Sequence, residues 1–212
     1  MKHFKIIPFL CNHFPLILLG ILAVTTVLSY IDAYDHQVWQ AEFSSVAFLI
    51  LLLSLTYRKF KFSNWAYVIL TLWAILQLIG AHYTFERVPF EWVNSWFGFE
   101  RNHYDRVAHF VVGCSSFAIS ELVYRKKWVS GRIVATFAGI IFIMALANAW
   151  ELLEWTYAEL DGGPAGQAFL GSQGDIWDAQ KDMLMDTLGA ILAGILFYFW
   201  SKKNLNAIEA TK

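Results

Sequence analysis

The most unusual feature of the sequence is a series of carboxylates at the start of its last apolar stretch. The segment 174–190 reads GDIWDAQKDMLMDTLGA and continues into the apolar run ILAGILFYFW. Each step of four residues along an α-helix advances about 6 Å and turns about 40° beyond a full turn. We therefore predict that Asp178, Asp182 and Asp186 share one helix face at increasing depth. Such carboxylates can bind cations, exchange protons or pair with basic side chains.

Two other segments carry residues of complementary chemistry. The segment RNHYDRVAHF contains His109 one helical turn after Asp105. The segment NAWELLEW contains Glu151 and Glu154, which are three residues apart and therefore neighbours on one helix face. If the three segments meet at one depth, they bring imidazole and carboxylate groups together without a thiolate.

These segments belong to a chain with the composition of a membrane protein. Hydrophobic residues make up 58% and aromatic residues 17% of its 212 residues, more than an ordinary soluble domain contains. A membrane-spanning helix needs about 20 apolar residues. Because backbone groups in lipid must be paired within the segment, we predict an all-α polytopic bundle that forms one integral membrane domain over residues 1–212. Its six predicted spans lie near 14–31, 43–57, 65–85, 107–124, 133–155 and 180–200.

Basic residues predict how the bundle is oriented. With both termini in the cytoplasm, twelve of the sixteen Lys and Arg residues fall on the cytoplasmic side. This distribution follows the positive-inside rule. The four basic residues on the outer side are Arg87, Arg101, Arg106 and Lys181. Most acids lie on or near the outer ends of the spans, so the polar chemistry is predicted to face outward.

The spans are predicted to differ in their exposure to lipid. The first two are nearly free of ionisable groups, and we interpret them as a lipid-facing lead-in to the bundle. In the last span, Gly189 with Ala193 and Ala190 with Gly194 form two small-xxx-small pairs, which allow a neighbouring helix to approach closely. The last span is therefore predicted to be packed, with its acids facing protein or water.

Several classes of function are disfavoured by the sequence. The net charge of −1 provides no basic surface for nucleic acid. Two cysteines, Cys11 and Cys114, are too few for a metal–thiolate set. The chain contains no HExxH, Walker A, GxSxG or dinucleotide-binding glycine motif.

We predict that the last three spans enclose an outward-facing pocket that holds a divalent metal. A charge at membrane depth costs at least about 2.5 kcal/mol, so bound cations, protons or basic partners must offset the clustered acids. Imidazole with carboxylate suits Zn²⁺, Mn²⁺ or Fe²⁺, and oxygen ligands alone suit Mg²⁺. The candidate ligands are His109, Glu151, Asp182, Asp186 and Asp105, and the candidate general bases are Glu154 and Asp178.

Three functions remain open on this pattern. The first is a metal-assisted hydrolase or transferase acting on a lipid or lipid-linked headgroup. The second is an ion- or proton-coupled transporter or channel in which the same acids form a relay. The third is a scaffold whose acids pair with Arg106 and Lys181. After Asp186 the last span offers only small and apolar residues until Trp200, and this asymmetry favours a one-sided enzyme site.

The motifs HYDRVAHF, ELLEW and GDIWDAQKDMLMDTLGA resemble the YjdF-type family of predicted bacterial inner-membrane proteins, a domain of unknown function. The resemblance covers roughly residues 10–200. It implies an inner-membrane location and membrane lipids as surroundings, and it implies no particular activity.

The chain is also similar, more loosely, to VanZ-like membrane proteins. In that family an Asp-x-x-x-His pair opens one helix, an acid sits in the next and an Asp precedes a glycine in the last. Asp105 with His109, Glu151, and Asp186 before Gly189 match the pattern. The extra acids of the last two spans, and the absence there of the expected Gln and Asn, depart from it.

Overall fold

The computed structural model confirms an all-α chain and describes residues 6–161, 163, 166 and 170–209. In chain order the helices are α1 (Ile6–Tyr30), α2 (His36–Thr56), α3 (Asn64–Tyr83), α4 (Glu91–Phe97), α5 (Tyr104–Gly113), α6 (Ser116–Arg125), α7 (Arg132–Asp161) and α9 (Asp178–Glu209).

Six stretches of the described chain are helical, long and apolar enough to cross a membrane, as the composition predicted. They are His13–Tyr30, His36–Thr56, Asn64–Tyr83, Tyr104–Arg125, Arg132–Leu160 and Asp178–Leu205. The second span begins at His36 rather than near residue 43. The reason is an N-cap: Asp35 Oδ1 accepts hydrogen bonds from the backbone N–H groups of Gln37 at 2.8 Å and Val38 at 3.1 Å, which starts the helix early.

The fourth span, expected as one helix, is two helices joined by a tight turn. α5 ends at Gly113 and α6 begins at Ser116, so the break lies in the middle of the span. Serine competes with helical hydrogen bonding, which favours a break at this point. The Ser116 hydroxyl instead donates to the Ala190 carbonyl of α9 at 2.8 Å.

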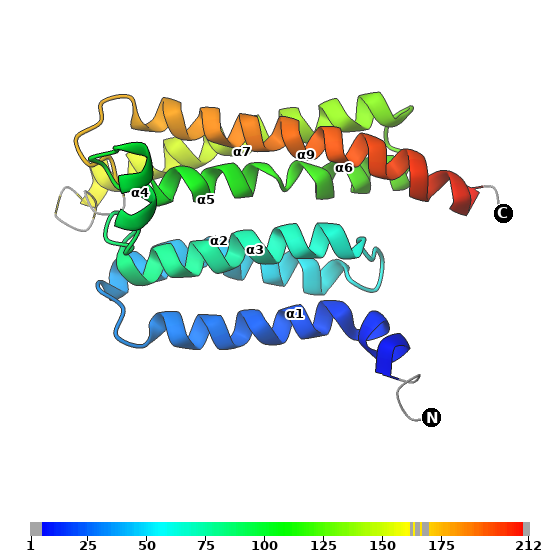
Figure 1. The fold of residues 1–212 in the computed structure, drawn as a ribbon, viewed down its shortest axis with the longest axis horizontal. Helices are drawn as coiled ribbons and strands as arrows, with labels where there is room; N and C mark the ends of the chain where they lie inside the picture. Colours follow the sequence, from blue (N-terminus) through cyan, green and yellow to red (C-terminus); the bar gives the residue numbers. More distant parts are fainter. Residues whose placement is uncertain (1–5, 162, 164–165, 167–169, 210–212) are drawn as a thin grey trace.

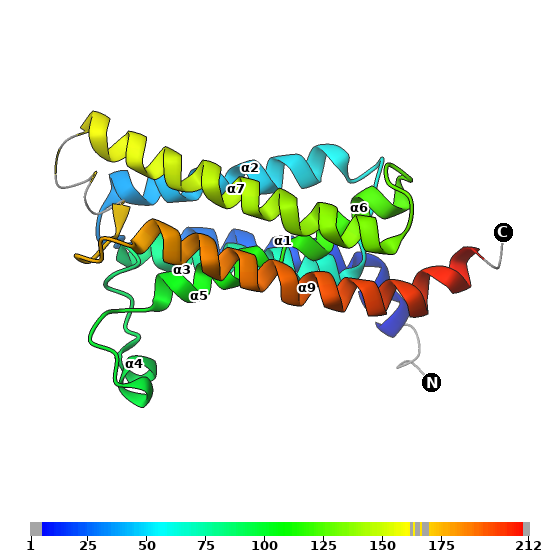
Figure 2. The ribbon, with the colours of Figure 1, turned by 90° about the horizontal axis from the view of Figure 1, so that it is seen from above.

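The bundle has two halves that meet at α3 and α5. α1 and α2 pack on α3, while α6, α7 and α9 pack among themselves and α9 packs on α5 (Figure 1). Because α5 contacts both α3 and α9, it lies between the halves. The short helix α4 projects sideways at one end of the bundle (Figure 2).

Glycines let α5 and α9 approach each other closely. A Cβ atom on Gly113 would collide with the backbone of Asp186, and one on Gly189 would collide with the carbonyl oxygen of Phe110. Ala190 and Ala193 are almost fully buried on the same helix. The predicted close packing of the last span is confirmed, and it places Asp186 directly beside α5.

The interpretation of the first two spans as a lipid-facing lead-in is correct for α1 and for most of α2, but α2 also has a buried face. Side chains along α1, such as Val24 and Leu28, are mostly exposed on the surface where lipid would lie. α2 leaves side chains such as Phe48 and Leu55 exposed, and it buries Trp39, Glu42 and Val46 against the rest of the bundle. A helix on one edge of a bundle still has one inward face, and α2 uses it for a carboxylate.

The first and the last described helices bring their chain-terminal ends to the same end of the bundle. The start of α1, the end of α9 and the turn from α6 to α7 gather there (Figure 1). That turn carries Arg125, Lys126 and Lys127, so it is the predicted cytoplasmic end. Lys2, Lys5 and Lys212, also counted toward that side, lie outside the described residues.

Candidate functional site

The centre of the polar cluster is the buried imidazole of His109 on α5, which carboxylates flank on two sides. His109 Nδ1 lies 2.9 Å from Asp186 Oδ2 of α9, a hydrogen-bond distance. His109 Nε2 lies 3.6 Å from Asp105 Oδ1, one turn earlier on α5. The glycine-mediated approach of α9 to α5 brings Asp186 to this position, and the helical repeat brings Asp105.

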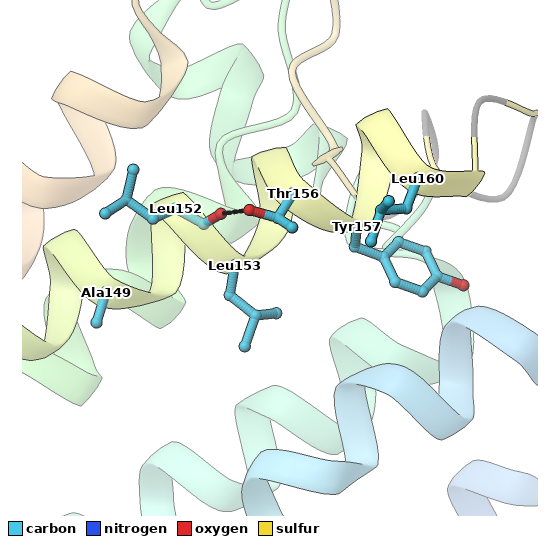
Figure 3. Close-up of a pocket in the computed structure, with 6 residues that line it drawn as sticks. All are labelled: Ala149, Leu152, Leu153, Thr156, Tyr157 and Leu160. Atoms are coloured by element: carbon cyan, nitrogen blue, oxygen red, sulfur yellow. Dashed lines mark hydrogen bonds between the residues drawn. The ribbon is translucent and has the colours of Figure 1, made fainter.

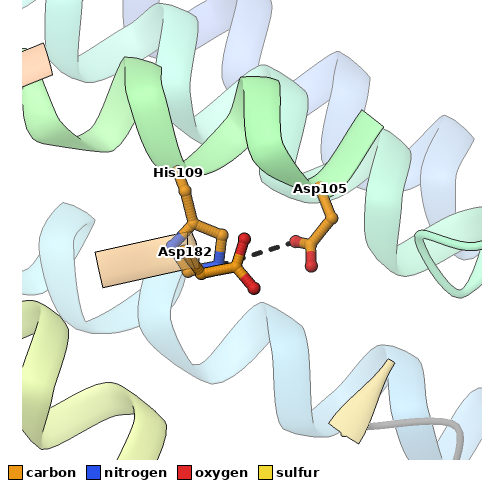
Figure 4. Close-up of side chains that lie close together, drawn as sticks. All are labelled: Asp105, His109 and Asp182. Atoms are coloured by element: carbon orange, nitrogen blue, oxygen red, sulfur yellow. Dashed lines mark ion pairs between the residues drawn. The ribbon is translucent and has the colours of Figure 1, made fainter. Parts of the chain in front are cut away.

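Asp182 completes a group of three potential metal ligands. Asp105, His109 and Asp182 each offer one ligand atom, and these three atoms lie within 4.8 Å of one another. Figure 4 shows Asp105 and His109 pointing from α5 toward Asp182 of α9. Ligand atoms about 2.1 Å from a tetrahedral metal are about 3.4 Å apart. The 3.6 Å between Nε2 and Oδ1 is close to that value and too long for a hydrogen bond.

Basic side chains neutralise the outer part of the cluster. Arg106 Nη2 lies 2.6 Å from Asp178 Oδ1, and Arg106 Nη1 forms an ion pair with Asp182. Arg101 Nη2 lies 2.5 Å from the same oxygen of Asp178. The expectation that basic partners offset part of the acid cluster is therefore met at Asp178 and Asp182.

Asp175, which lies outside the membrane-spanning segments, has its own basic partner. Lys181 Nζ donates to Asp175 Oδ2 at 2.6 Å, and the backbone N–H of Trp177 donates to Oδ1 at 3.0 Å. The lysine hydrogen bond lowers the pKa of Asp175, followed in importance by the backbone hydrogen bond. This carboxylate is a stabilised anion at the entrance to the cluster.

Three buried carboxylate oxygens of the described residues have no hydrogen-bond partner. They are Asp186 Oδ1, Glu151 Oε1 and Asp182 Oδ1, the last of which meets Arg106 without hydrogen-bond alignment. Asp182 and Asp186 are only 3% and 1% exposed. A buried oxygen without a partner is costly. Asp186 Oδ1 and Glu151 Oε1 thus have free acceptor capacity that the basic side chains do not use, whereas Asp182 Oδ1 is paired with Arg106.

The two acids of α7 lie near this centre without joining the group of three ligands. Glu154 Oε1 accepts a hydrogen bond from Trp150 Nε1 at 2.6 Å. Glu151 interacts electrostatically with His109 and Asp182. Of the five expected ligands, the structure groups Asp105, His109 and Asp182, places Asp186 on the other side of the imidazole, and leaves Glu151 outside the group.

Glu42 is a buried acid that the sequence reasoning missed. Its side chain is 3% exposed, its Oε2 accepts a hydrogen bond from Gln77 Nε2 of α3 at 2.7 Å, and it interacts electrostatically with Asp105 and His109. The available signal was a lone acid beside a long apolar run. The predicted second span begins near residue 43, so Glu42 lies just outside it.

The histidines at the edges have local partners instead. His82 Nδ1 lies 2.9 Å from the Ser29 carbonyl oxygen, and the His103 ring stacks on Phe99 with 4.2 Å between ring centroids. Both are consistent with the structural roles that interfacial histidines usually have.

Comparison with known proteins agrees with the membrane architecture and the resemblance of the motifs. Residues 14–203 match the family described as "Predicted membrane protein (DUF2238)". The chain is 37% identical over 183 residues to the inner membrane protein YjdF of Escherichia coli (strain K12), which covers 84% of this chain and 87% of that protein. No solved structure matches the chain. The chain is therefore an integral inner-membrane protein that belongs to the DUF2238 family.

Proposed function

We propose that this protein is a metal-assisted hydrolase or transferase that acts on the headgroup of a lipid or a lipid-linked molecule from the outer side of the membrane. Asp105, His109 and Asp182 bind one divalent cation in this proposal. The cation activates a water or a substrate oxygen as a Lewis acid.

The observation that carries the proposal is the orientation of His109. One ring nitrogen is held by a buried carboxylate, Asp186, and the other faces two further carboxylates. A histidine ligand commonly hydrogen-bonds a second carboxylate through its other nitrogen, which fixes the ring and strengthens the ligand. Asp186 is accordingly assigned as the orienting partner of His109 rather than as a ligand.

The charge balance supports a cation at this place. Eight carboxyl groups, from Asp105, Asp175, Asp178, Asp182, Asp186, Glu42, Glu151 and Glu154, converge on the region, and its permanent cations are Arg101, Arg106 and Lys181. A divalent ion reduces this excess of negative charge. An oxygen-rich set with one imidazole suits Zn²⁺, Mn²⁺ or Fe²⁺.

A proton acceptor is also available. Of the two expected general bases, Glu154 keeps this role in the proposal because both arginines already occupy the Asp178 carboxylate. The electrostatic interactions of Glu154 with Asp105 and His109 support this role.

The test is metal analysis of protein purified in detergent, with and without chelator. We expect wild type to retain a stoichiometric divalent ion and to lose thermal stability on chelation. Asp182→Asn removes a ligand and abolishes both effects. Asp186→Asn leaves the ligands in place and weakens metal binding by roughly 10- to 100-fold, as loss of an orienting carboxylate does elsewhere.

Asp175→Asn is the matched control, since it removes an acid of the same region that pairs only with basic side chains and backbone. Its metal content is expected to equal that of wild type. Absence of metal from wild type, with no response to added Zn²⁺ or Mn²⁺, would contradict the proposal.

Proton or ion transport is the second candidate, favoured by the break in the fourth span. Ser115 at the break and Ser120, which lies nearer the predicted cytoplasmic end, carry buried hydroxyls without hydrogen-bond partners. Broken helices with such groups line the paths of transporters. Proteoliposomes with a pH-sensitive dye inside distinguish the candidates: transport predicts a proton flux that His109→Gln removes, and the enzyme proposal predicts no flux.

A further inference from the structure

The sides of the bundle carry the apolar surface that a membrane-spanning protein needs. Figure 3 shows part of this surface on α7, where Leu152, Leu153 and Leu160 are half exposed or more. Such side chains are expected on helices that face lipid. Lipid therefore surrounds the spans, and its outer boundary lies where the spans end, near Tyr83 of α3 and Tyr104 of α5.

The short helix α4 lies beside the bundle at the level of this boundary. Figures 1 and 2 agree on its place, next to the outer ends of α3 and α5 and to one side of them. Among the described residues, α4 is not part of a closely packed pair of helices. The bundle therefore leaves most of the surface of α4 uncovered.

The base of α4 is nevertheless fixed to the bundle. Asn94 is buried, and its Oδ1 accepts a hydrogen bond at 3.4 Å from the backbone N–H of His103, the N-cap of α5. The centroid of the Phe90 ring lies 5.5 Å from that of Tyr104, whose hydroxyl donates to the Leu76 carbonyl of α3 at 2.8 Å. These contacts hold α4 at a fixed level relative to the spans.

The exposed surface of α4 changes from polar to apolar around the helix. Glu91 and Ser95, four residues apart, share a polar edge, and both are exposed. Trp92, Trp96 and Phe97 are 59%, 74% and 67% exposed. With 3.6 residues per turn, Phe97 lies on the far side of the helix from the polar edge, and the two tryptophans lie between them.

The aromatic surface continues past the end of α4. Gly98 ends the helix with a φ of 69°, which glycine adopts without steric cost. The Phe99 ring then stacks on the Phe97 ring with 5.6 Å between centroids and is 46% exposed. The two ring pairs, Trp92 with Trp96 and Phe97 with Phe99, form an exposed aromatic surface of the kind that marks an interaction site.

We propose that α4 is an in-plane membrane anchor whose aromatic surface lies in the headgroup layer of the outer leaflet. Tryptophan suits this layer because its ring is apolar and its indole N–H can still bond to water or a headgroup. Phe97 faces the acyl chains, and Ser95 faces water. The helix contains no Lys or Arg, so apolar burial holds it at the surface and not attraction to anionic lipid.

Two observations favour the membrane over a second protein as the occupant of this surface. The surface lies beside the spans, at the level where headgroups already surround the bundle. The order of its side chains, from polar through tryptophan to phenylalanine, also follows the change from water to hydrocarbon across the interface. A protein partner would require neither feature.

The anchor is connected to the polar cluster through the chain between α4 and α5. Arg101 Nη2 lies 2.5 Å from Asp178 Oδ1, and Asn102 exchanges two hydrogen bonds of 3.1 Å with Gln173. Arg101 and Asn102 follow Phe99 by two and three residues. An anchored α4 therefore fixes the arginine that neutralises Asp178 relative to the membrane surface.

Depth measurements in vesicles test the inference. A fluorescent label is attached to Phe97→Cys or Ser95→Cys, with Cys11 and Cys114 replaced. It is quenched by iodide on both sides of the membrane or by lipids with a nitroxide near the headgroup. We expect the lipid nitroxide to quench Phe97→Cys several-fold more than Ser95→Cys, and iodide to give the reverse order. Leu192→Cys, in the middle of α9, should respond only to a nitroxide near the end of the acyl chain.

A matched pair of tryptophan changes tests whether the aromatic rings hold α4 in place. In the labelled Phe97→Cys protein, Trp92→Ser together with Trp96→Ser should raise iodide quenching several-fold. Trp128→Ser removes an exposed tryptophan at the other end of the bundle and should leave the quenching unchanged.

Two results would overturn the inference. Strong iodide quenching of both the Phe97→Cys and the Ser95→Cys label would place the whole of α4 in water. A Phe97→Cys label that neither iodide nor the lipid nitroxide reaches would show that protein, not lipid, covers the aromatic surface.

Discussion

Acidic side chains are buried at both ends of the bundle. The two ends differ in how completely hydrogen bonds and ion pairs occupy the carboxylate oxygens. At the predicted cytoplasmic end, Glu121 of α6 is fully buried and has partners for both oxygens. Oε1 accepts from the Ser63 backbone N–H at 2.9 Å and from Arg125 Nη1 at 2.5 Å, and Oε2 accepts from the Ser63 hydroxyl at 2.7 Å. We call Ser63, Glu121 and Arg125 the inner clasp. It joins α6 to the N-cap of α3.

The outer cluster is formed by Asp105, Arg106, His109, Asp178, Asp182 and Asp186. It leaves Asp186 Oδ1 without a hydrogen bond, and Asp182 Oδ1 meets only Arg106. It also gathers several like charges within one layer. A fully paired acid of one helix stabilises a fold, whereas clustered acids with unused acceptors oppose folding unless something binds them. The completeness of pairing therefore distinguishes the structural acid Glu121 from the acids of the candidate site. Burial does not distinguish them, because both kinds are buried.

The largest expected difference is in thiol labelling, which tests which end of the bundle faces outward. Cysteines introduced at Ser95 and Ser130, both exposed, lie at opposite ends of the bundle. In a background without Cys11 and Cys114, an impermeant thiol reagent added to intact cells should label Ser95→Cys and spare Ser130→Cys. The reverse pattern would place the inner clasp outside and remove the argument for an outward-facing site.

Removal of the inner clasp should lower stability strongly. Glu121→Ala leaves the two Ser63 donors without their acceptor, which costs about 1 to 3 kcal/mol, whereas Arg125, with a side chain 35% exposed, can be hydrated. Thermal or denaturant unfolding in detergent measures the loss. Glu121→Gln keeps one acceptor oxygen and should lose less.

The comparison predicts a different response in the outer cluster. In metal-free protein, Asp186→Ala should cost less than Glu121→Ala, because repulsion among the remaining carboxylates falls when one is removed. An equal or larger loss would mean that the outer cluster is a structural network like the inner clasp.

A Cβ atom at the crossing of α5 and α9 should have a moderate effect. Gly189→Ala forces the two backbones apart and is expected to cost about 1 to 3 kcal/mol, as overpacking does. It should also separate His109 from Asp186 and weaken metal binding. Gly20→Ala on α1 is the control, since a Cβ there meets nothing within 4 Å. If Gly189→Ala left the free energy of unfolding unchanged, α5 and α9 would separate easily, which conflicts with the close approach of their backbones.

The smallest effect is expected at the rim, where Lys181 pairs with Asp175. The lysine lowers the pKa of Asp175, so its stabilising contribution is present above the ordinary pKa of 3.8 and is lost as the pH falls through the lowered value. Lys181→Met should therefore reduce thermal stability slightly at neutral pH and not at all once Asp175 is protonated. A difference between the two proteins that persists in acid would assign the effect of Lys181 to packing instead.

Helical periodicity and hydropathy were sufficient for much of this architecture. The six spans, the common face of Asp178, Asp182 and Asp186, and the pairing of Asp105 with His109 all follow from repeats of three to four residues, which act within one helix. The close approach of α9 was also readable from its small residues. These features are local, so a single sequence contains them.

The sequence by itself therefore determined the membrane class, the helices and which residues share a face. Only the tertiary structure decided that Glu42 of α2 joins the cluster, that Asp186 binds the imidazole while Asp182 faces Arg106, and that Glu121 is paired with Ser63. Each of these contacts joins residues 58 or more positions apart. Such contacts depend on how whole helices rotate and cross, which is set by the summed packing of the bundle and not by the spacing of residues along one helix.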